Sequence, residues 1–395
     1  MSLATAPLCE IAEVAAGGGA PQNSGAFTNE GTPFIRAGSL NPLVNGASER
    51  SLEHLTDEVA KQHGLRKFPR DTVVFAKSGM SATKGHVYRL RNEAYVVNHL
   101  AALIPNQRVV PEFLEHSLRA FSPIRLIQDA GYPSIRLSDI AAMQIPLPPL
   151  AEQRRIAEVL DRAEALRAKC HAALAQLDSL TQSLFLDLFG DPASNPRGWP
   201  RVTLGELITK GPQNGLYKPS SEYGSGIPIL RIDAFYSGQV TKLDVLKRVR
   251  VSKEECDLYG LQVGEIVINR VNSMEYLGKS ALIPELQEPT VFESNMMRFD
   301  IDRDNVEPCY LVQFLQTNFI KSQILTASKN AVNQSSINQQ DVKSFRINVP
   351  PFPLQREFAR RVRAVEKLKT AERASLAELD ALFDSLQYRA FRGEL

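Results

Sequence analysis

The chain has 395 residues, enough for more than one domain, and its 18 Phe and 10 Tyr supply the apolar cores that disordered chains lack. The formal net charge is only +2, so any nucleic-acid binding must come from local basic patches. The start lacks the basic and apolar parts of a signal peptide, and no run approaches the ~18 apolar residues of a membrane span. The four cysteines are far apart, as expected of free thiols in a reducing compartment. We expect a cytoplasmic protein without a structural metal.

Residues before Pro146 predict a first globular domain. Strands are expected at residues 33–36 and 72–77, where β-branched and aromatic residues end at turn signals. Residues 87–90 and 94–97 predict a hairpin that turns at residues 91–93. The segment 111–120 begins with proline and predicts a helix, because proline suits the first helical turn.

A long helix is predicted after the prolines at positions 146, 148 and 149. No proline or glycine occurs between Leu150 and Leu188, and apolar residues recur every three or four positions. Such a helix is roughly 57 Å long, at ~1.5 Å per residue, which exceeds what one globular domain usually needs. Its apolar stripe therefore requires a partner.

The residues after Gly190 repeat the order of the first domain. Residues 228–231 correspond to 33–36, residues 265–270 to the strand that begins at Thr72, and residues 308–315 to the helix at 111–120. Ser336 and Ile337 correspond to Ser134 and Ile135. Between these markers the two halves differ almost completely, which indicates one scaffold that carries two different surfaces.

The last segment repeats the long helix at a constant offset, which is the signature of an internal repeat. The corresponding partner-docking or coiled-coil residues are Gln153, Arg154, Ile156, Leu160, Leu174, Leu177 and Leu184 in the first copy and Gln355, Arg356, Phe358, Val362, Leu376, Leu379 and Leu386 in the second. Two such stripes related by a pseudo-two-fold axis favour an antiparallel coiled coil. The alternative is two independent amphipathic helices, each packed on its own domain.

The predicted fold class is α+β: two globular α/β target-recognition domains and two long helices that pair as an antiparallel coiled coil. The expected boundaries are 1–148 for the first domain, 149–188 for the central helix, 189–350 for the second domain and 351–395 for the C-terminal helix. Phosphate-loop, dinucleotide-binding, zinc-protease and nucleophile-elbow motifs are all missing. We therefore assign no catalytic residue and no metal ligand.

Basic and amide side chains gather in loops of both domains. Arg and Lys suit phosphates and guanine edges, and Asn and Gln suit adenine edges, so such loops can both position and specify DNA. An ordinary solvated surface is the simpler interpretation of each patch alone, but equivalent placement in a repeat favours function. The candidate DNA-binding residues are Lys77, Ser78, Lys84, His86, Arg89, Ser134, Lys218, Arg248, Arg250, Arg270, Asn272, Lys279, Lys329, Asn333 and Gln334.

The segment PLPPLAEQRRIA at residues 146–157 resembles the signature that enters the central helix of type I restriction–modification specificity subunits. Residues 352–356 and 391–395 resemble the family's weaker C-terminal copy. Residues 211–218 and 227–231 are similar to the start of a family target-recognition domain. The second copy departs from the first at Pro353 and Leu354, which replace Ala151 and Glu152.

The resemblance implies that each domain reads one half of a bipartite double-stranded DNA target and that the helices hold the domains apart. It also implies partners: two modification (methyltransferase) subunits, which carry S-adenosylmethionine, and restriction subunits, which use ATP and Mg²⁺. The chain itself would hold no cofactor and perform no catalysis. Two other hypotheses stay open at this point: a coiled-coil adaptor that spaces two protein-binding domains, and a DNA methyltransferase or nuclease with an unrecognised site.

Overall fold

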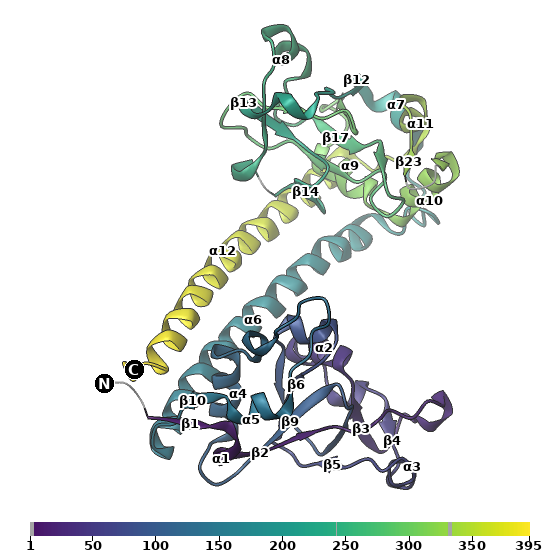
Figure 1. Cartoon of the computed structure of the whole chain (residues 1–395). Coiled ribbons are helices and arrows are strands. Elements are labelled where there is room, and N and C mark those ends of the chain that lie inside the picture. Colours follow the sequence, from purple (N-terminus) through teal and green to yellow (C-terminus); the bar gives the residue numbers. More distant parts are fainter. Residues whose placement is uncertain (1–3, 242, 331–333) are drawn as a thin grey trace. The chain divides into compact units, whose positions relative to one another are not determined.

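In the computed structural model, which describes residues 4–241, 243–330 and 334–395, the chain forms two compact units. Unit 1 consists of Met1–Ala172 and Arg373–Leu395, and unit 2 of Ala173–Glu372. Each unit therefore contains one globular domain and part of both long helices, α6 (Leu150–Phe189) and α12 (Phe352–Ala390) (Figure 1). The four segments expected from the sequence have their boundaries at the ends of the long helices. The two compact units, by contrast, meet near the middle of each long helix.

The two long helices pair antiparallel inside each unit. In unit 1, Arg167 Nε of α6 lies 2.6 Å from Asp380 Oδ1 of α12, and Arg155 donates to the carbonyl of Leu395 at 2.9 Å. In unit 2, Lys369 of α12 lies 3.0 Å from Asp178 of α6. Residue numbers thus fall along α12 as they rise along α6. The α+β fold with a paired helical repeat is confirmed, and the alternative of two independent helices is wrong.

Unit 1 has two four-stranded sheets, ordered β2-β9-β6-β7 and β4-β3-β8-β5. The central strand β6 is buried along its whole length, as its run of apolar residues predicts. The elements are β1 Thr5–Pro7, α1 Leu8–Ile11, β2 Ala12–Ala16, β3 Thr32–Ile35, α2 Leu40–Val44, β4 His54–Leu55, α3 Asp57–Gln62, β5 Lys67–Phe68, β6 Val73–Ala76, β7 Val87–Arg89, β8 Ala94–Val96, β9 Leu100–Pro105, α4 Pro111–Ala120, α5 Leu137–Ala142 and β10 Gln144–Pro146.

The predicted hairpin between residues 87–90 and 94–97 is wrong. Strand β7 pairs with β6, whereas β8 pairs parallel with β3 and antiparallel with β5. The buried carboxylate of Glu49 captures the connection between them, since it accepts hydrogen bonds from the backbone amides of Arg91 at 2.7 Å and Asn92 at 3.0 Å. The chain therefore passes from one sheet to the other instead of turning back.

Unit 2 repeats this layout with additions. Its main sheet has the order β12-β21-β17-β19-β15-β14, of which the first four strands match β2-β9-β6-β7 in place. The elements are β11 Arg201–Thr203, α7 Leu204–Leu207, β12 Ile208–Asn214, β13 Tyr223–Leu230, β14 Phe235–Tyr236, β15 Gly238–Val240, β16 Arg248–Val249, α8 Lys253–Tyr259, β17 Ile266–Asn269, β18 Val271–Asn272, β19 Ser280–Leu282, β20 Val291–Phe292, β21 Met296–Ile301, α9 Pro308–Leu315, α10 Asn318–Ala327, β22 Lys329–Asn330, β23 Ser335–Ser336, α11 Gln339–Ser344 and β24 Arg346–Asn348.

A strand pair closes each domain. In unit 1, β1 pairs antiparallel with β10, so that Ala6 faces Ile145. In unit 2, β11 pairs antiparallel with β24, so that Val202 faces Ile347. The strand at the end of each domain leads directly into a long helix. The beginning and the end of each domain are therefore neighbours in space.

A buried glutamine at the start of each long helix, here called the glutamine clamp, fixes the helix to its domain. Gln153 accepts a hydrogen bond from the Val110 amide at 2.8 Å and donates to the carbonyls of Arg108 and Pro148. Gln355 accepts from the Glu307 amide at 2.9 Å and donates to the Pro350 carbonyl at 2.7 Å. Each side chain thus supplies a hydrogen-bond partner to the carbonyl of a proline at the end of its domain, Pro148 or Pro350.

Among the described residues, no helix is long and apolar enough to cross a membrane.

Candidate nucleic-acid interface

A cluster of predicted residues, here called loop site 1, lies at the end of the central strand of unit 1. Lys77 and Ser78 follow β6, and Ser78 forms an isolated antiparallel bridge with Ser134. The Ile135 amide donates to the Lys77 carbonyl at 2.8 Å, and the Gly79 amide donates to the Pro133 carbonyl at 2.9 Å. Loops almost 60 positions apart in the sequence are thus joined by backbone bonds, and the structure brings these three predicted residues together.

The equivalent position in unit 2, loop site 2, has the same backbone pattern. The Ile337 amide donates to the Arg270 carbonyl at 3.0 Å, and β18 pairs with β23 so that Val271 faces Ser336, as Ser78 faces Ser134. The next pair of residues is Asn272 and Ser335. Arg270 Nη1 donates to the Ser294 carbonyl at 3.3 Å. The adjacent Gln334 is exposed. Of the other predicted residues here, Lys329 lies in β22 but its side chain is outside the description, and Asn333 lies outside the described residues.

Two residues beside loop site 1 are not among the predicted DNA-binding residues. His99 Nδ1 lies 2.8 Å from Ser78 Oγ, and its carbonyl accepts from the Lys77 amide. Tyr132 is 85% exposed two residues before Ser134, which is unusual for a large aromatic side chain without a ligand. The predicted residues Lys84 and His86 flank Gly85, with Lys84 exposed and His86 half-buried. An unpatterned loop gives no periodic signal that would have identified His99 or Tyr132.

Lys279 is placed differently from the other predicted residues of unit 2. Its Nζ donates to the Ile232 carbonyl at 2.6 Å and lies 4.0 Å from the ring centre of Tyr236 and 4.7 Å from that of Phe235. Burial lowers the pKa of Lys279 to about 8, although the aromatic rings favour the ammonium form. The side chain lines a cavity of about 560 Å³ together with helix residues, among them Thr181 and Lys369.

Three further predicted cations of unit 2 have internal partners. Lys218 Nζ lies 2.8 Å from Glu255 and its side chain is only 16% exposed. Arg248 pairs with Glu288 at 2.6 Å, and Arg250 Nε donates to Ser225 Oγ at 3.0 Å. Arg248 belongs to the sheet β16-β13-β20, which is separate from the sheet that ends at loop site 2. A DNA contact by Lys218 would require it to leave its carboxylate.

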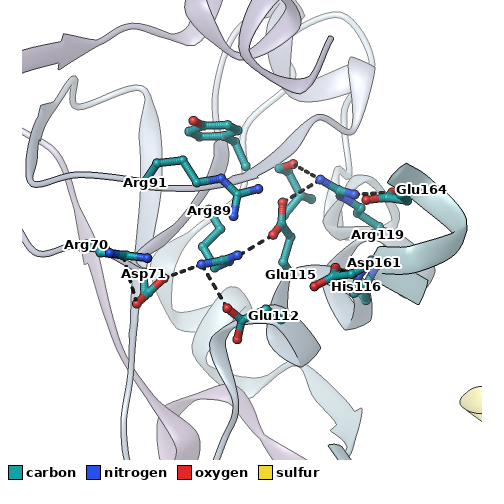
Figure 2. Close-up of polar contacts among 12 residues, drawn as sticks. Arg70, Asp71, Arg89, Arg91, Glu112, Glu115, His116, Arg119, Asp161 and Glu164 are labelled. Carbon is teal, nitrogen blue, oxygen red and sulfur yellow. Dashed lines mark hydrogen bonds and ion pairs between the residues drawn. The ribbon is translucent and has the colours of Figure 1, made fainter. Parts of the chain in front are cut away.

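Arg89 is a core residue, and its assignment as a DNA contact is wrong. The residue is 7% exposed in β7, and its guanidinium contacts the carboxylates of Asp71, Glu112 and Glu115 (Figure 2). Burial lowers its pKa, but the three carboxylates outweigh this effect and the net pKa is raised. The charge is neutralised inside the domain, so it is not presented to a phosphate.

The predicted helix residues fall into three groups. Ile156, Leu160, Phe358 and Val362 are buried, and Leu174, Leu177, Leu184, Leu376, Leu379 and Leu386 are partly buried along the helix pair. Gln153 and Gln355 form the glutamine clamps, so docking of a partner by these two side chains is wrong because their polar atoms are already bonded within the chain. Arg154 and Arg356, by contrast, are exposed.

Comparisons with known proteins agree with this architecture. The family described as "Type I restriction modification DNA specificity domain" matches residues 4–176 and again residues 196–381. The type I restriction enzyme EcoKI specificity subunit of Escherichia coli (strain K12) is 25% identical over 387 residues, which cover 92% of this chain and 82% of that protein. The StySPI specificity subunit of Salmonella potsdam is 24% identical over 385 residues, with the same coverage.

Solved structures show the same fold. The type I restriction–modification S subunit from M. genitalium matches with a TM-score of 0.62 and 13% identity, over 99% of this chain and 96% of that one. A chain from a study of complex assembly and conformational transition of the type I restriction–modification system matches with a TM-score of 0.56 and 21% identity, over 100% and 98% of the two chains. With two family matches that together span most of the sequence, the chain belongs to the type I restriction–modification DNA specificity family.

Proposed function

We propose that this chain is the DNA-recognition subunit of a type I restriction–modification complex and that each unit reads one half of a bipartite target. The observation that carries the proposal is the repeat of the loop sites. Loop sites 1 and 2 occupy the same place at the end of the central strand and share the bond from Ile135 or Ile337 to the residue after that strand, but they carry different side chains: Lys77 and Ser78 in one, Arg270 and Val271, followed by Asn272, in the other. Equivalent placement with different chemistry suits two readers of two sequences.

The proposal extends to partners that the family implies. Modification subunits, two per chain, would dock on the long helices, where Arg154 and Arg356 are exposed, and would carry S-adenosylmethionine. Restriction subunits would supply ATP- and Mg²⁺-dependent translocation and cleavage. This chain would then select the DNA sequence on which the other subunits act, without performing catalysis itself. We expect the complex to work in the cytoplasm. The adaptor and the enzyme hypotheses explain neither the repeated loop sites nor the family match.

The test is methylome sequencing of a host that expresses the modification partner with and without this chain. We expect a methylated two-part motif that disappears when the chain is removed. A variant with Lys77→Glu and Ser134→Glu should lose the motif through one half-site, while a matched variant with Arg162→Glu on the exposed face of α6 keeps it. An unchanged methylome without the chain, with the partner expressed, would overturn the proposal.

A further inference from the structure

A chain of ion pairs crosses unit 1 from its sheet to the long helix α6 (Figure 2). It begins at Asp71, in the loop before β6, which contacts Arg89 of β7. Arg89 Nη1 lies 3.1 Å from Glu112, and Arg89 Nε donates to Glu115 at 3.3 Å, both on α4. The first half of this ion-pair chain therefore ties the sheet to α4.

The second half of the ion-pair chain ties α4 to α6. Arg119 donates to Glu115 at 2.6 Å and, through its other terminal nitrogen, to Glu164 of α6. His116 Nε2 lies 2.7 Å from Oδ1 of Asp161, almost one helical turn from Glu164. The His116 side chain is 1% exposed, and its Nδ1 has no hydrogen-bond partner among the described residues. Two adjacent ion pairs on one helix face fix both the position and the rotation of α4.

Each carboxylate of α6 in this contact has a hydrogen-bond donor from α4. Burial raises the pKa of Asp161, but the hydrogen bond from His116 and the charges of His116, Arg89 and Arg91 outweigh it, so the pKa is lowered. Removing one member of a pair leaves a partly buried polar or charged group without a partner, which lowers the stability of the fold. The contact therefore has one preferred geometry, whereas an apolar contact tolerates sliding.

Unit 2 joins its domain to the long helix with fewer charges: among the described residues, Arg363 of α12 lies 3.8 Å from Glu307, just before α9. Counted from the prolines that begin α4 and α9, the positions of His116 and Arg119 correspond to Gln313 and Gln316. Gln316 donates to Ser280 of its own domain at 2.8 Å rather than to α12, which takes the place of α6 in unit 2. Among the described residues, the two ion pairs that His116 and Arg119 make with the long helix therefore have no counterpart at Gln313 and Gln316.

The His116, Asp161 and Glu164 ligand atoms lie within 4.8 Å of one another, so a metal ion is the competing explanation. Arg119 already neutralises Glu164, and Arg89 and Arg91 add positive charge near Asp161. A divalent cation would have to displace the Arg119 guanidinium from Glu164 and the imidazole of His116 from Asp161. The ion-pair interpretation is therefore the stronger one.

We propose that the pairs His116–Asp161 and Arg119–Glu164 are positioning residues, which orient the first recognition domain on α6 and so set the half-site spacing that the complex accepts. The inference rests on the proposed function, because it concerns how one half-site is placed relative to the other. The reasoning is geometric: a bipartite reader discriminates spacings only if each domain is held rigidly on its connecting helix.

The test uses the complex with its modification subunits and duplexes that carry both half-sites with the native spacer or one base pair more or less. The dissociation constants at fixed salt are compared for wild type, for Asp161→Ala with Glu164→Ala, and for Asp161→Asn with Glu164→Gln. The last variant keeps the size of both residues and one acceptor oxygen on each, but removes their charge. The matched control is Glu158→Gln, because Glu158 pairs with Arg162 on the exposed face of the same helix.

We expect the alanine variant to lose about fivefold of the preference for the native spacer, while its affinity for that spacer changes less. The amide variant should retain most of the preference, and the control all of it. An alanine variant that melts earlier but discriminates spacers like wild type would overturn the inference, since the pairs would then be merely structural. Spacer preference that is lost on chelation with EDTA would assign the triad to a metal and overturn it too. Wild type that binds none of the duplexes would instead defeat the proposed function itself.

Discussion

The two units attach their globular domains to the long helices with different side chains. In unit 1, the domain meets α6 through ion pairs, with Phe113 of α4 packed 5.6 Å from Phe391 near the end of the chain. In unit 2, the equivalent contact is an aromatic cluster, in which Tyr310 of α9 lies 4.7 Å from Phe189 at the end of α6. Each unit thus joins the start of one long helix to the end of the other.

The difference teaches which parts of the scaffold are fixed by geometry and which are free. Both units keep a glutamine clamp and an aromatic residue where α4 or α9 meets the helix pair. Around these points, unit 1 uses charges with directional bonds, whereas unit 2 uses ring packing, which is stronger per residue but less directional. The comparison predicts different responses to mutation and to pH.

The largest effect should come from breaking the aromatic cluster of unit 2. Phe358 is fully buried and lies 5.3 Å from Phe189 and 5.7 Å from Phe185. We expect Phe358→Ala to lower the free energy of unfolding by about 3–5 kcal/mol, because it leaves a cavity among rings. Trp199, the single tryptophan, donates to the Phe189 carbonyl at 3.0 Å, so its fluorescence in urea reports on this region.

The matched control is Leu368→Ala on an exposed face of the same helix, which should change stability by less than about 0.5 kcal/mol. A Phe358→Ala transition that coincides with that of wild type would show that the aromatic cluster does not hold unit 2 together.

The glutamine clamps should have intermediate and equal effects. Gln153→Leu and Gln355→Leu each leave a buried amide and at least one buried carbonyl without a partner, which costs about 1–3 kcal/mol. Protection of α4 and α9 in hydrogen exchange measures the two sites in the same sample. Clearly unequal losses would mean that the repeat preserves these side chains without preserving their role.

The smallest effect should be an acid sensitivity of the contact between α4 and α6. The folded pKa of Asp161 lies below its unfolded value of about 3.8, so its contribution is complete above that pH and is lost as the pH falls through the folded value. Because the carboxylate is half-exposed, we expect less than about 1 kcal/mol. The protection factors of the α4 amides, which correct for the slower intrinsic exchange in acid, should fall between pH 5 and pH 3 more in wild type than in Asp161→Asn. An equal fall in both would rule out this pair as its source.

The long helices and their pairing were predictable because their signals are local and repeated. A segment without proline or glycine and a constant offset between two apolar stripes identify the helices without knowledge of the fold. The correspondence of Ser134 with Ser336 likewise placed the loop sites at the same point of both domains. These signals depend on the order of residues along the chain.

Arg89 and the hairpin could not be predicted because their partners come from distant segments. Asp71, Glu112 and Glu115 surround Arg89 only after the sheet has packed against α4, and no local pattern separates it from an exposed arginine. Glu49 redirects the chain between β7 and β8 from 42 positions away. The sequence repeat identified Gln153 and Gln355 as corresponding residues, but it could not predict the backbone groups to which they bond.

The strand pairs that close the domains have a consequence for how such proteins diversify. Because β11 and β24 lie side by side, the second domain leaves its scaffold through a single two-stranded neck. A foreign domain with the same neck would meet the long helices with no change in their length or register, and the pair β1 and β10 gives the first domain the same property. Each recognition domain could therefore be exchanged as a unit. Recombination between genes, rather than stepwise mutation, would then give a new specificity in one event.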